Sequence, residues 1–185
     1  MKKAMLKAAA LGMTAAMALS VMAGCGNNGG SSDADYKTGV KFKVGDTFKI
    51  GGMGPLTGEN ASYGISVKNG AQVAVDEINA AGGINGMKLE LFFEDDEASP
   101  EKAATAYNKL MDNEIVAMLG ATTSGATIAL GELTKQDGIL QLTPSGSAQD
   151  CTKYGNAFRI CFTDPLQGKN MADYIYTTLG KKKIA

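Results

Sequence analysis

The stretch from Ile50 to Gly86 constrains the fold of this chain more than any other part of the sequence. A strand predicted at 48–52 leads into a glycine-rich loop and a long helix, and a second strand is predicted at 89–93. The apolar residues of the helix recur at helical spacing, which predicts one buried stripe. They are Val67, Ala71, Ala74, Val75 and Ile78. A strand, a helix and a strand in this order predict two parallel strands joined by a right-handed crossover.

The rest of the chain repeats this alternation. Short apolar runs predict further strands at 115–119, 139–142 and 158–162, each preceded or followed by a helical pattern. Runs of this kind are typical of strands that are covered on both faces. We therefore predict an α/β fold, a doubly wound parallel sheet in three α/β/α layers, with sites at the carboxyl ends of the strands.

The N-terminus has the pattern of an export signal. Three lysines precede an apolar run at 8–23, which is short and rich in small residues for a membrane span. The run ends in Ala23-Gly24-Cys25, which resembles the lipobox of bacterial lipoproteins. We expect residues 1–24 to be removed and Cys25 to be lipidated; the alternative is an ordinary secretory signal. Residues 25–46 are predicted to form a flexible tether.

Composition excludes several classes of function. The 185-residue chain is 44% hydrophobic and 20% charged, which is typical of a globular domain. It contains no histidine, so it has neither a Ser-His-Asp triad nor an imidazole metal ligand. A formal charge of -1 argues against a nucleic-acid surface. We predict no cofactor and no metal site.

Two segments carry a resemblance to a known family. They are GPLTGENASYG at 54–64 and NGAQVAVDEINAAGGING at 69–86. Together they resemble the N-terminal lobe of the branched-chain amino acid (Leu/Ile/Val) binding proteins of bacterial ABC importers, which are type I periplasmic binding proteins. The resemblance implies a ligand-binding lobe at 47–180 and the start of a second lobe at 181–185.

The same resemblance implies a site for an amino acid. Ser124 lies where a helix N-terminus and a hydroxyl would suit a carboxylate. Ser145 and Ser147 would offer a backbone carbonyl and a hydroxyl to an ammonium group. Tyr63 corresponds to the tyrosine that packs on the ligand side chain, and Gly125 stands where the family often has serine. A structural role as a helix cap is the alternative for Ser124.

Other motifs are weaker. Ser99 and Lys102 match the Ser-x-x-Lys motif of penicillin-interacting enzymes, but Lys37-Thr38-Gly39 precedes the serine instead of following it. Helix capping is the better explanation of Ser99.

The acidic run at 94–97 lacks the alternating ligands of a calcium loop and is expected to be a solvated strand end. Cys151 and Cys161 are expected to form a disulfide, with two free thiols as the alternative.

These expectations favour one function. The chain resembles the ligand-capture lobe of an extracytoplasmic lipoprotein that binds a neutral amino acid and delivers it to the permease of an ABC importer. We predict no enzymatic activity, no contact with nucleic acid, and attachment to the membrane through the lipid alone. The alternative is the extracellular amino-acid-sensing module of a receptor with the same fold.

Overall fold

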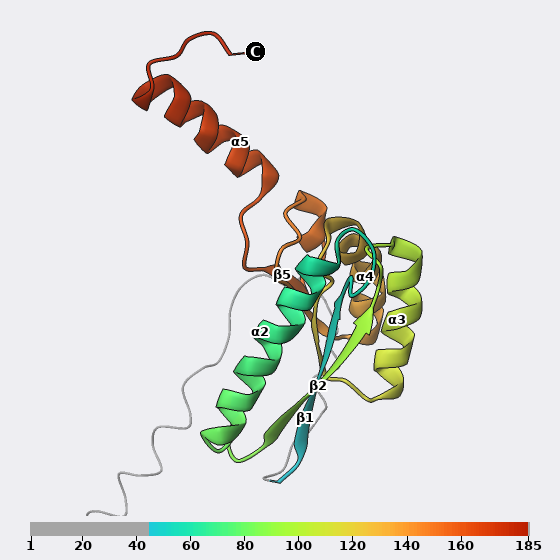
Figure 1. Cartoon of the computed structure of the whole chain (residues 1–185). Helices are drawn as coiled ribbons and strands as arrows, with labels where there is room; N and C mark the ends of the chain where they lie inside the picture. Colours follow the sequence, from blue (N-terminus) through green and yellow to red (C-terminus); the bar gives the residue numbers. More distant parts are fainter. Residues whose placement is uncertain (1–44, 185) are drawn as a thin grey trace, which may run out of the picture. The chain divides into compact units, whose positions relative to one another are not determined.

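The computed structural model describes residues 45–184 and contains a parallel sheet flanked by helices (Figure 1). The strands of the described part are β1 (Thr47–Gly54), β2 (Lys88–Asp95), β3 (Ala117–Leu119), β4 (Leu140–Thr143) and β5 (Ala157–Arg159). They pair in the order β2-β1-β3-β4-β5, and each pairing is parallel. Because β2 and β3 lie on opposite sides of β1, the sheet is doubly wound, which confirms the predicted fold class. The predicted signal, Cys25 and most of the tether lie outside the described residues.

Helices connect these strands and follow the last of them. The connecting elements are α2 (Ala61–Ala80), α3 (Pro100–Asp112), α4 (Ser124–Asp137) and the 3-10 turn η1 (Gln149–Thr152). After β5 come α5 (Asp164–Asp173) and the π-helical η2 (Tyr174–Thr178). α2 ends before Gly82 and Gly83, which take the positive φ angles of 105° and 82° that favour glycine. The Gly83 N–H donates to Ile78 O at 2.8 Å and closes the last turn.

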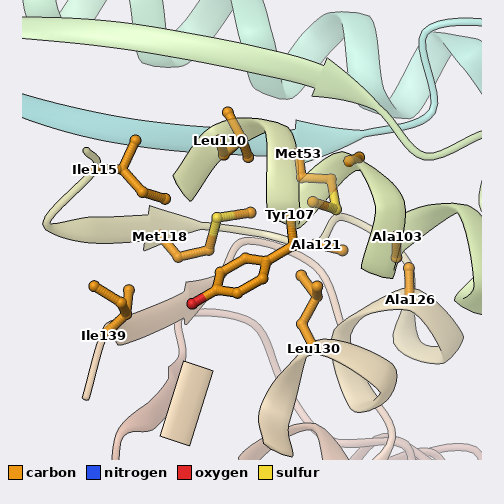
Figure 2. Close-up of a cluster of buried hydrophobic side chains, with 11 residues drawn as sticks. Met53, Ala103, Tyr107, Leu110, Ile115, Met118, Ala121, Ala126, Leu130 and Ile139 are labelled. Atoms are coloured by element: carbon orange, nitrogen blue, oxygen red, sulfur yellow. The ribbon is translucent and has the colours of Figure 1, made fainter. Parts of the chain in front are cut away.

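The main core lies between the sheet and the helix pair α3 and α4. Figure 2 shows Tyr107 and Leu110 of α3 converging with Met53 of β1, Met118 of β3 and Leu130 of α4. All five side chains are 1% exposed or less. α3 and α4 thus cover one face of the sheet.

α2 covers the opposite face, over β1 and β2 (Figure 1). Of its predicted stripe, Val75 is buried, whereas Ala74 is exposed. The strand register places Leu140 of β4 on the same face as Ile50 of β1, and Phe158 of β5 follows it there. Leu140 and Phe158 are about half exposed, at 51% and 52%. Among the described residues, α2 thus leaves an apolar part of this face open to solvent.

Some predicted boundaries shift. The strand expected at 158–162 is β5, which begins one residue earlier and ends at Arg159. Ile160 N still donates to Thr143 O at 3.3 Å, and Ile160 is 71% exposed. Of the strand expected at 115–119, only the last three residues form β3. Val116, just before β3, still donates its N–H to Lys49 O. α5 begins at Asp164, and none of its residues is buried.

Candidate functional site

The candidate binding residues lie beyond the carboxyl ends of neighbouring strands. Tyr63 is in the first turn of α2, which follows β1. Ser124 is the first residue of α4, which follows β3, and Ser145 and Ser147 follow β4. Since β1 and β3 are adjacent at the point where the strand order reverses, this is where a doubly wound sheet binds its ligands.

One open hollow connects two of these elements. Its volume is about 290 Å³, and it lies between the start of α2 and the loop after β4. Its lining residues are Ser62, Tyr63, Ser66, Val67 and Ser145. The Tyr63 ring is 62% exposed, so one side of it is free to contact a bound molecule. None of the described lining residues is charged, so a charged ligand group would meet hydroxyls and backbone groups there.

Ser124 joins the two halves of the site. Its Oγ accepts a hydrogen bond from Ala148 N at 3.3 Å, which ties the loop after β4 to the start of α4. The N-cap residue of α4 is Thr123 rather than Ser124. The first N–H groups of α4 have no acceptor within the helix and favour an anionic group nearby. Thr123 Oγ1 is buried without a hydrogen-bond partner among the described residues, a feature that the sequence did not indicate.

The loop after β4 presents its serines differently. Ser145 Oγ donates to Thr122 O, which links the loop to the end of β3. Ser147 O accepts a hydrogen bond from Asp164 N at 3.1 Å, whereas its hydroxyl bonds to no described residue. The Ser147 hydroxyl is therefore available to a ligand, and that of Ser145 has a structural partner.

The two glycines near the candidate serines differ in how much space surrounds them. A Cβ at Gly146 would lie 2.7 Å from Thr143 Oγ1 and 3.0 Å from Cys151 Sγ, so this residue must be small. A Cβ at Gly125 would meet only Pro100 Cγ, at 3.6 Å, which is an ordinary contact. Gly125 is exposed in the first turn of α4, where a side chain would project without a clash.

A buried polar network supports the strand ends beneath the site. Gln141 of β4 is 0% exposed and donates to Gly120 O and Thr127 O, while its Oε1 accepts from Thr134 at 2.8 Å. Thr143 Oγ1 donates to Ala121 O at 2.8 Å and accepts from Gly146 N at 2.9 Å. Because buried polar groups without partners are costly, this network favours one arrangement of the two loops.

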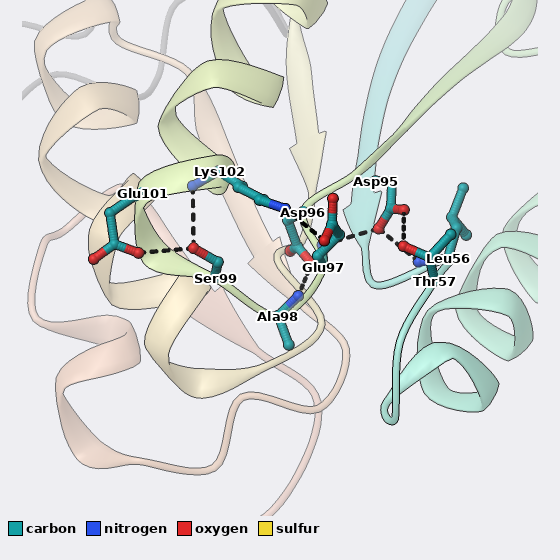
Figure 3. Close-up of polar contacts among 9 residues, drawn as sticks. All are labelled: Leu56, Thr57, Asp95, Asp96, Glu97, Ala98, Ser99, Glu101 and Lys102. Atoms are coloured by element: carbon teal, nitrogen blue, oxygen red, sulfur yellow. Dashed lines mark hydrogen bonds and ion pairs between the residues drawn. The ribbon is translucent and has the colours of Figure 1, made fainter.

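The acidic run at the end of β2 is structural (Figure 3). Asp95 accepts hydrogen bonds from Leu56 N and the Thr57 hydroxyl, at 2.8 and 2.7 Å, and so orders the loop after β1. Partial burial acts to raise the pKa of Asp95, but these bonds and one from Glu97 N outweigh it and lower the pKa. Burial raises the pKa of Asp96, whose neighbour Asp95 adds to the effect. The described residues contain no cluster of three or more potential metal ligands from histidine, cysteine and the acidic side chains.

Ser99 caps α3. Its Oγ accepts from Lys102 N at 3.3 Å and donates to Glu101 at 2.7 Å (Figure 3). This hydrogen bond lowers the pKa of Glu101. The Lys102 ammonium pairs with Glu97 instead of approaching the Ser99 hydroxyl. The geometry therefore matches the predicted capping role rather than that of an activated serine.

The expected disulfide is not formed. Cys151 and Cys161 are both free thiols. Cys151 Sγ lies 3.8 Å from Ser124 O, and Cys161 Sγ lies 3.5 Å from Gly146 O. Burial raises the pKa of Cys151, which disfavours the thiolate that disulfide exchange requires. Each sulfur instead contacts a backbone carbonyl of the candidate site.

A second hollow lies apart from this site. Its volume is about 300 Å³, it runs along α5, and none of its lining residues is a candidate binding residue. They are Phe162, Leu166, Gln167, Asn170, Met171 and Tyr174.

None of the helices in the described part of the chain is both long and apolar enough to cross a membrane.

Comparison with known proteins identifies the class. A family model described as "Periplasmic binding protein" matches residues 47–185, and the chain belongs to this family. The Leu/Ile/Val-binding protein BraC3 of Rhizobium johnstonii is 41% identical over 135 residues, which are 72% of this chain and 37% of that protein.

Solved structures agree. The branched-chain amino acid transporter substrate-binding protein LivJ of Streptococcus pneumoniae, in complex with isoleucine, is 35% identical with a TM-score of 0.68. The alignment covers 73% of this chain and 39% of LivJ. An ABC transporter substrate-binding protein of Desulfitobacterium hafniense, in complex with Leu, is 31% identical with a TM-score of 0.63, covering 72% and 39% of the two chains. The chain thus spans less than two fifths of the length of these relatives, and the family resemblance is confirmed.

Proposed function

We propose that the full-length protein is an extracytoplasmic solute-binding protein that captures a neutral L-amino acid of the branched-chain type and delivers it to an ABC importer. One observation carries the proposal. Tyr63 and Ser145 line an open hollow beside the switch point of the sheet, and the Ser124 hydroxyl accepts a hydrogen bond from Ala148 N in the loop that also carries Ser147. The names of the relatives support amino acids as the ligand class.

The chemistry of an α-amino acid fits these groups. Its carboxylate would lie at the N-terminus of α4, near the Ser124 hydroxyl, where helix N–H groups favour an anion. Its ammonium would donate to the Ser147 hydroxyl and to the carbonyl of Ser145. Its side chain would pack on Tyr63, which is 62% exposed. No covalent chemistry is needed, so the proposed role is binding and not catalysis.

Two serine substitutions test this assignment. A hydrogen bond to a charged group contributes about 1.5–3 kcal/mol, so Ser124→Ala and Ser147→Ala should each weaken L-leucine binding about ten- to a hundredfold. Titration calorimetry on the full-length protein measures the effect. Thr105→Ala is a matched control, because it removes an exposed hydroxyl of α3 that does not line the hollow.

The assignment is wrong if Ser124→Ala and Ser147→Ala both bind L-leucine as tightly as the wild type. Ser145→Ala should have a smaller effect than either, because its side chain bonds to Thr122 O and only its carbonyl is proposed to reach the ligand. Tight binding of a sugar or a peptide without any binding of amino acids would overturn the ligand class.

We also propose that the protein is anchored as a lipoprotein through Cys25. The support is the lysine-led apolar run that ends in Ala-Gly-Cys. Mass spectrometry of protein extracted from membranes would detect a lipid-modified cysteine at the mature N-terminus. A mature N-terminus beyond Cys25 would overturn this part of the proposal and leave the binding function untouched.

A further inference from the structure

Arg159 makes an unusual set of contacts next to the candidate site. It is the last residue of β5 and pairs in register with Thr143 of β4. None of the ion pairs among the described residues includes it. Its guanidinium faces the carbonyl oxygens of four consecutive residues instead, at 146–149, and the Thr152 hydroxyl.

The distances show one cation bound by a backbone loop. Nη1 lies 3.1, 3.0 and 2.8 Å from the carbonyl oxygens of Gly146, Ser147 and Ala148. Nη2 lies 2.8 Å from Gln149 O and 2.8 Å from Thr152 Oγ1. Only arginine offers several donors in a rigid plane, so a single side chain can bond to both ends of this turn.

These contacts orient the rest of the loop. With its carbonyls facing Arg159, the loop directs other groups toward the neighbouring strands: Gly146 N donates to Thr143 Oγ1, and Ala148 N donates to Ser124 Oγ. The loop is therefore held from two sides, by the guanidinium and by the start of α4. Within 145–149, Ser145 has the carbonyl to which no described residue donates.

We propose that Arg159 is a positioning residue that preorganises the loop at 145–149, which carries the acceptors assigned above to the ligand's ammonium group. The inference about the ammonium rests on the proposed function. The anchoring of the loop does not, because it follows from the contacts of the protein alone. Hydrogen bonds to a charged donor are stronger than neutral ones, so their loss should loosen the loop before the ligand arrives.

The experiment combines two measurements on the full-length protein. Hydrogen exchange without ligand follows the amides of 145–149, with α3 as an internal reference. Arg159→Gln should speed exchange in the loop about tenfold or more and leave α3 unchanged. Titration with L-leucine should show binding weakened about tenfold or more. Arg159→Lys keeps the charge but lacks the planar fork, so both of its values should fall between those of Arg159→Gln and the wild type.

Lys153→Gln is the matched control. Lys153 is an exposed cation in the same segment, placed over the Tyr154 ring at 5.6 Å, and its loss should change neither measurement. Wild-type exchange and affinity in Arg159→Gln would overturn the proposal. If Arg159→Gln does not fold, the test uses Arg159→Lys. Wild-type loop exchange together with wild-type L-leucine affinity in Arg159→Lys would then overturn the proposal. A wild type that binds no amino acid refutes the proposed function, while the exchange data still decide the role of Arg159.

Discussion

Asp95 and Asp96 are neighbours in the sequence, yet their surroundings shift their pKa values in opposite directions. Asp95 is half-exposed and accepts hydrogen bonds at both of its oxygens. Asp96 is 0% exposed, and its Oδ2 has no partner among the described residues. The acidic run therefore contains two structural residues, Asp95 and Asp96, whose pKa values shift in opposite directions although their composition does not distinguish them.

Asp95→Asn is expected to lower the free energy of unfolding at pH 7. The folded-state pKa of Asp95 is lowered, so its stabilising contribution is fully present above the unfolded-state value of 3.8 and is lost as the pH falls through the folded-state value. The difference between wild type and variant should thus shrink below about pH 3.8. Urea unfolding at pH 7 and pH 3 measures it.

The control for this measurement is Asp112→Asn, an exposed carboxyl that bonds to no described residue, and it should show little change at either pH. The pKa of Asp96 is raised, so its contribution to the free energy of unfolding is lost as the pH rises, whereas that of Asp95 is lost as the pH falls. The comparison therefore uses the difference between variants and not the pH dependence of the wild type. An Asp95→Asn effect of the same size at pH 3 and pH 7 would contradict the explanation.

At the scale of elements, the position of α2 depends on one glycine. A Cβ at Gly64 would lie 1.9 Å from Pro55 O, so the first turn of α2 packs directly on the loop after β1. This contact places Tyr63 at the edge of the hollow shared with Ser145. The helix carries a second glycine, Gly70, around which a Cβ would meet nothing within 4 Å.

The two glycines of α2 should respond oppositely to alanine. Gly64→Ala should destabilise the protein by about 1–3 kcal/mol, since the added methyl group forces the helix away from the loop. Gly70→Ala should stabilise it by about 0.5–1 kcal/mol, because alanine loses less backbone entropy in a helix. Chemical denaturation of both variants measures the difference, and changes of the same sign in both would contradict it.

At the scale of the whole molecule, the sheet is covered unequally. Within residues 45–184, α3 and α4 cover one face with the main core, whereas α2 covers the other face over β1 and β2 and leaves the rest of it open. An open apolar hollow of about 210 Å³ remains on that face, lined by residues of β1, β3 and β4. Exposed apolar patches of this kind favour association with other apolar surfaces.

The segment 45–185, expressed alone, should therefore self-associate through this face. Leu140→Lys combined with Phe158→Lys should reduce the association, and because both side chains are half-exposed the fold should be retained. Sedimentation velocity over a range of concentrations measures the effect, with circular dichroism to check folding. Val73→Lys is the control, because Val73 is 56% exposed on α2 and does not line the hollow. Equal association of the double variant and the wild type would contradict the prediction.

The sequence by itself determined the alternation of strands and helices and the position of the hydroxyl groups after β3 and β4. Both depend on residues close together in the chain. The apolar period of α3, the serine before Pro100 and the glycines after α2 specify local conformation, because the capping and φ preferences act within one turn. The fold class follows from the order of these local units.

The tertiary structure decided the contacts between distant residues. The bonds from Arg159 to the carbonyls at 146–149 depend on how β4 and β5 pair, which no local pattern near Arg159 indicates. Cys151 and Cys161 remain free thiols. A disulfide requires the two side chains to point toward each other, and the spacing of two cysteines in the chain does not determine that direction. The site is predictable as a set of loops at strand ends, but its preorganisation depends on a cation and a buried polar network contributed by neighbouring strands.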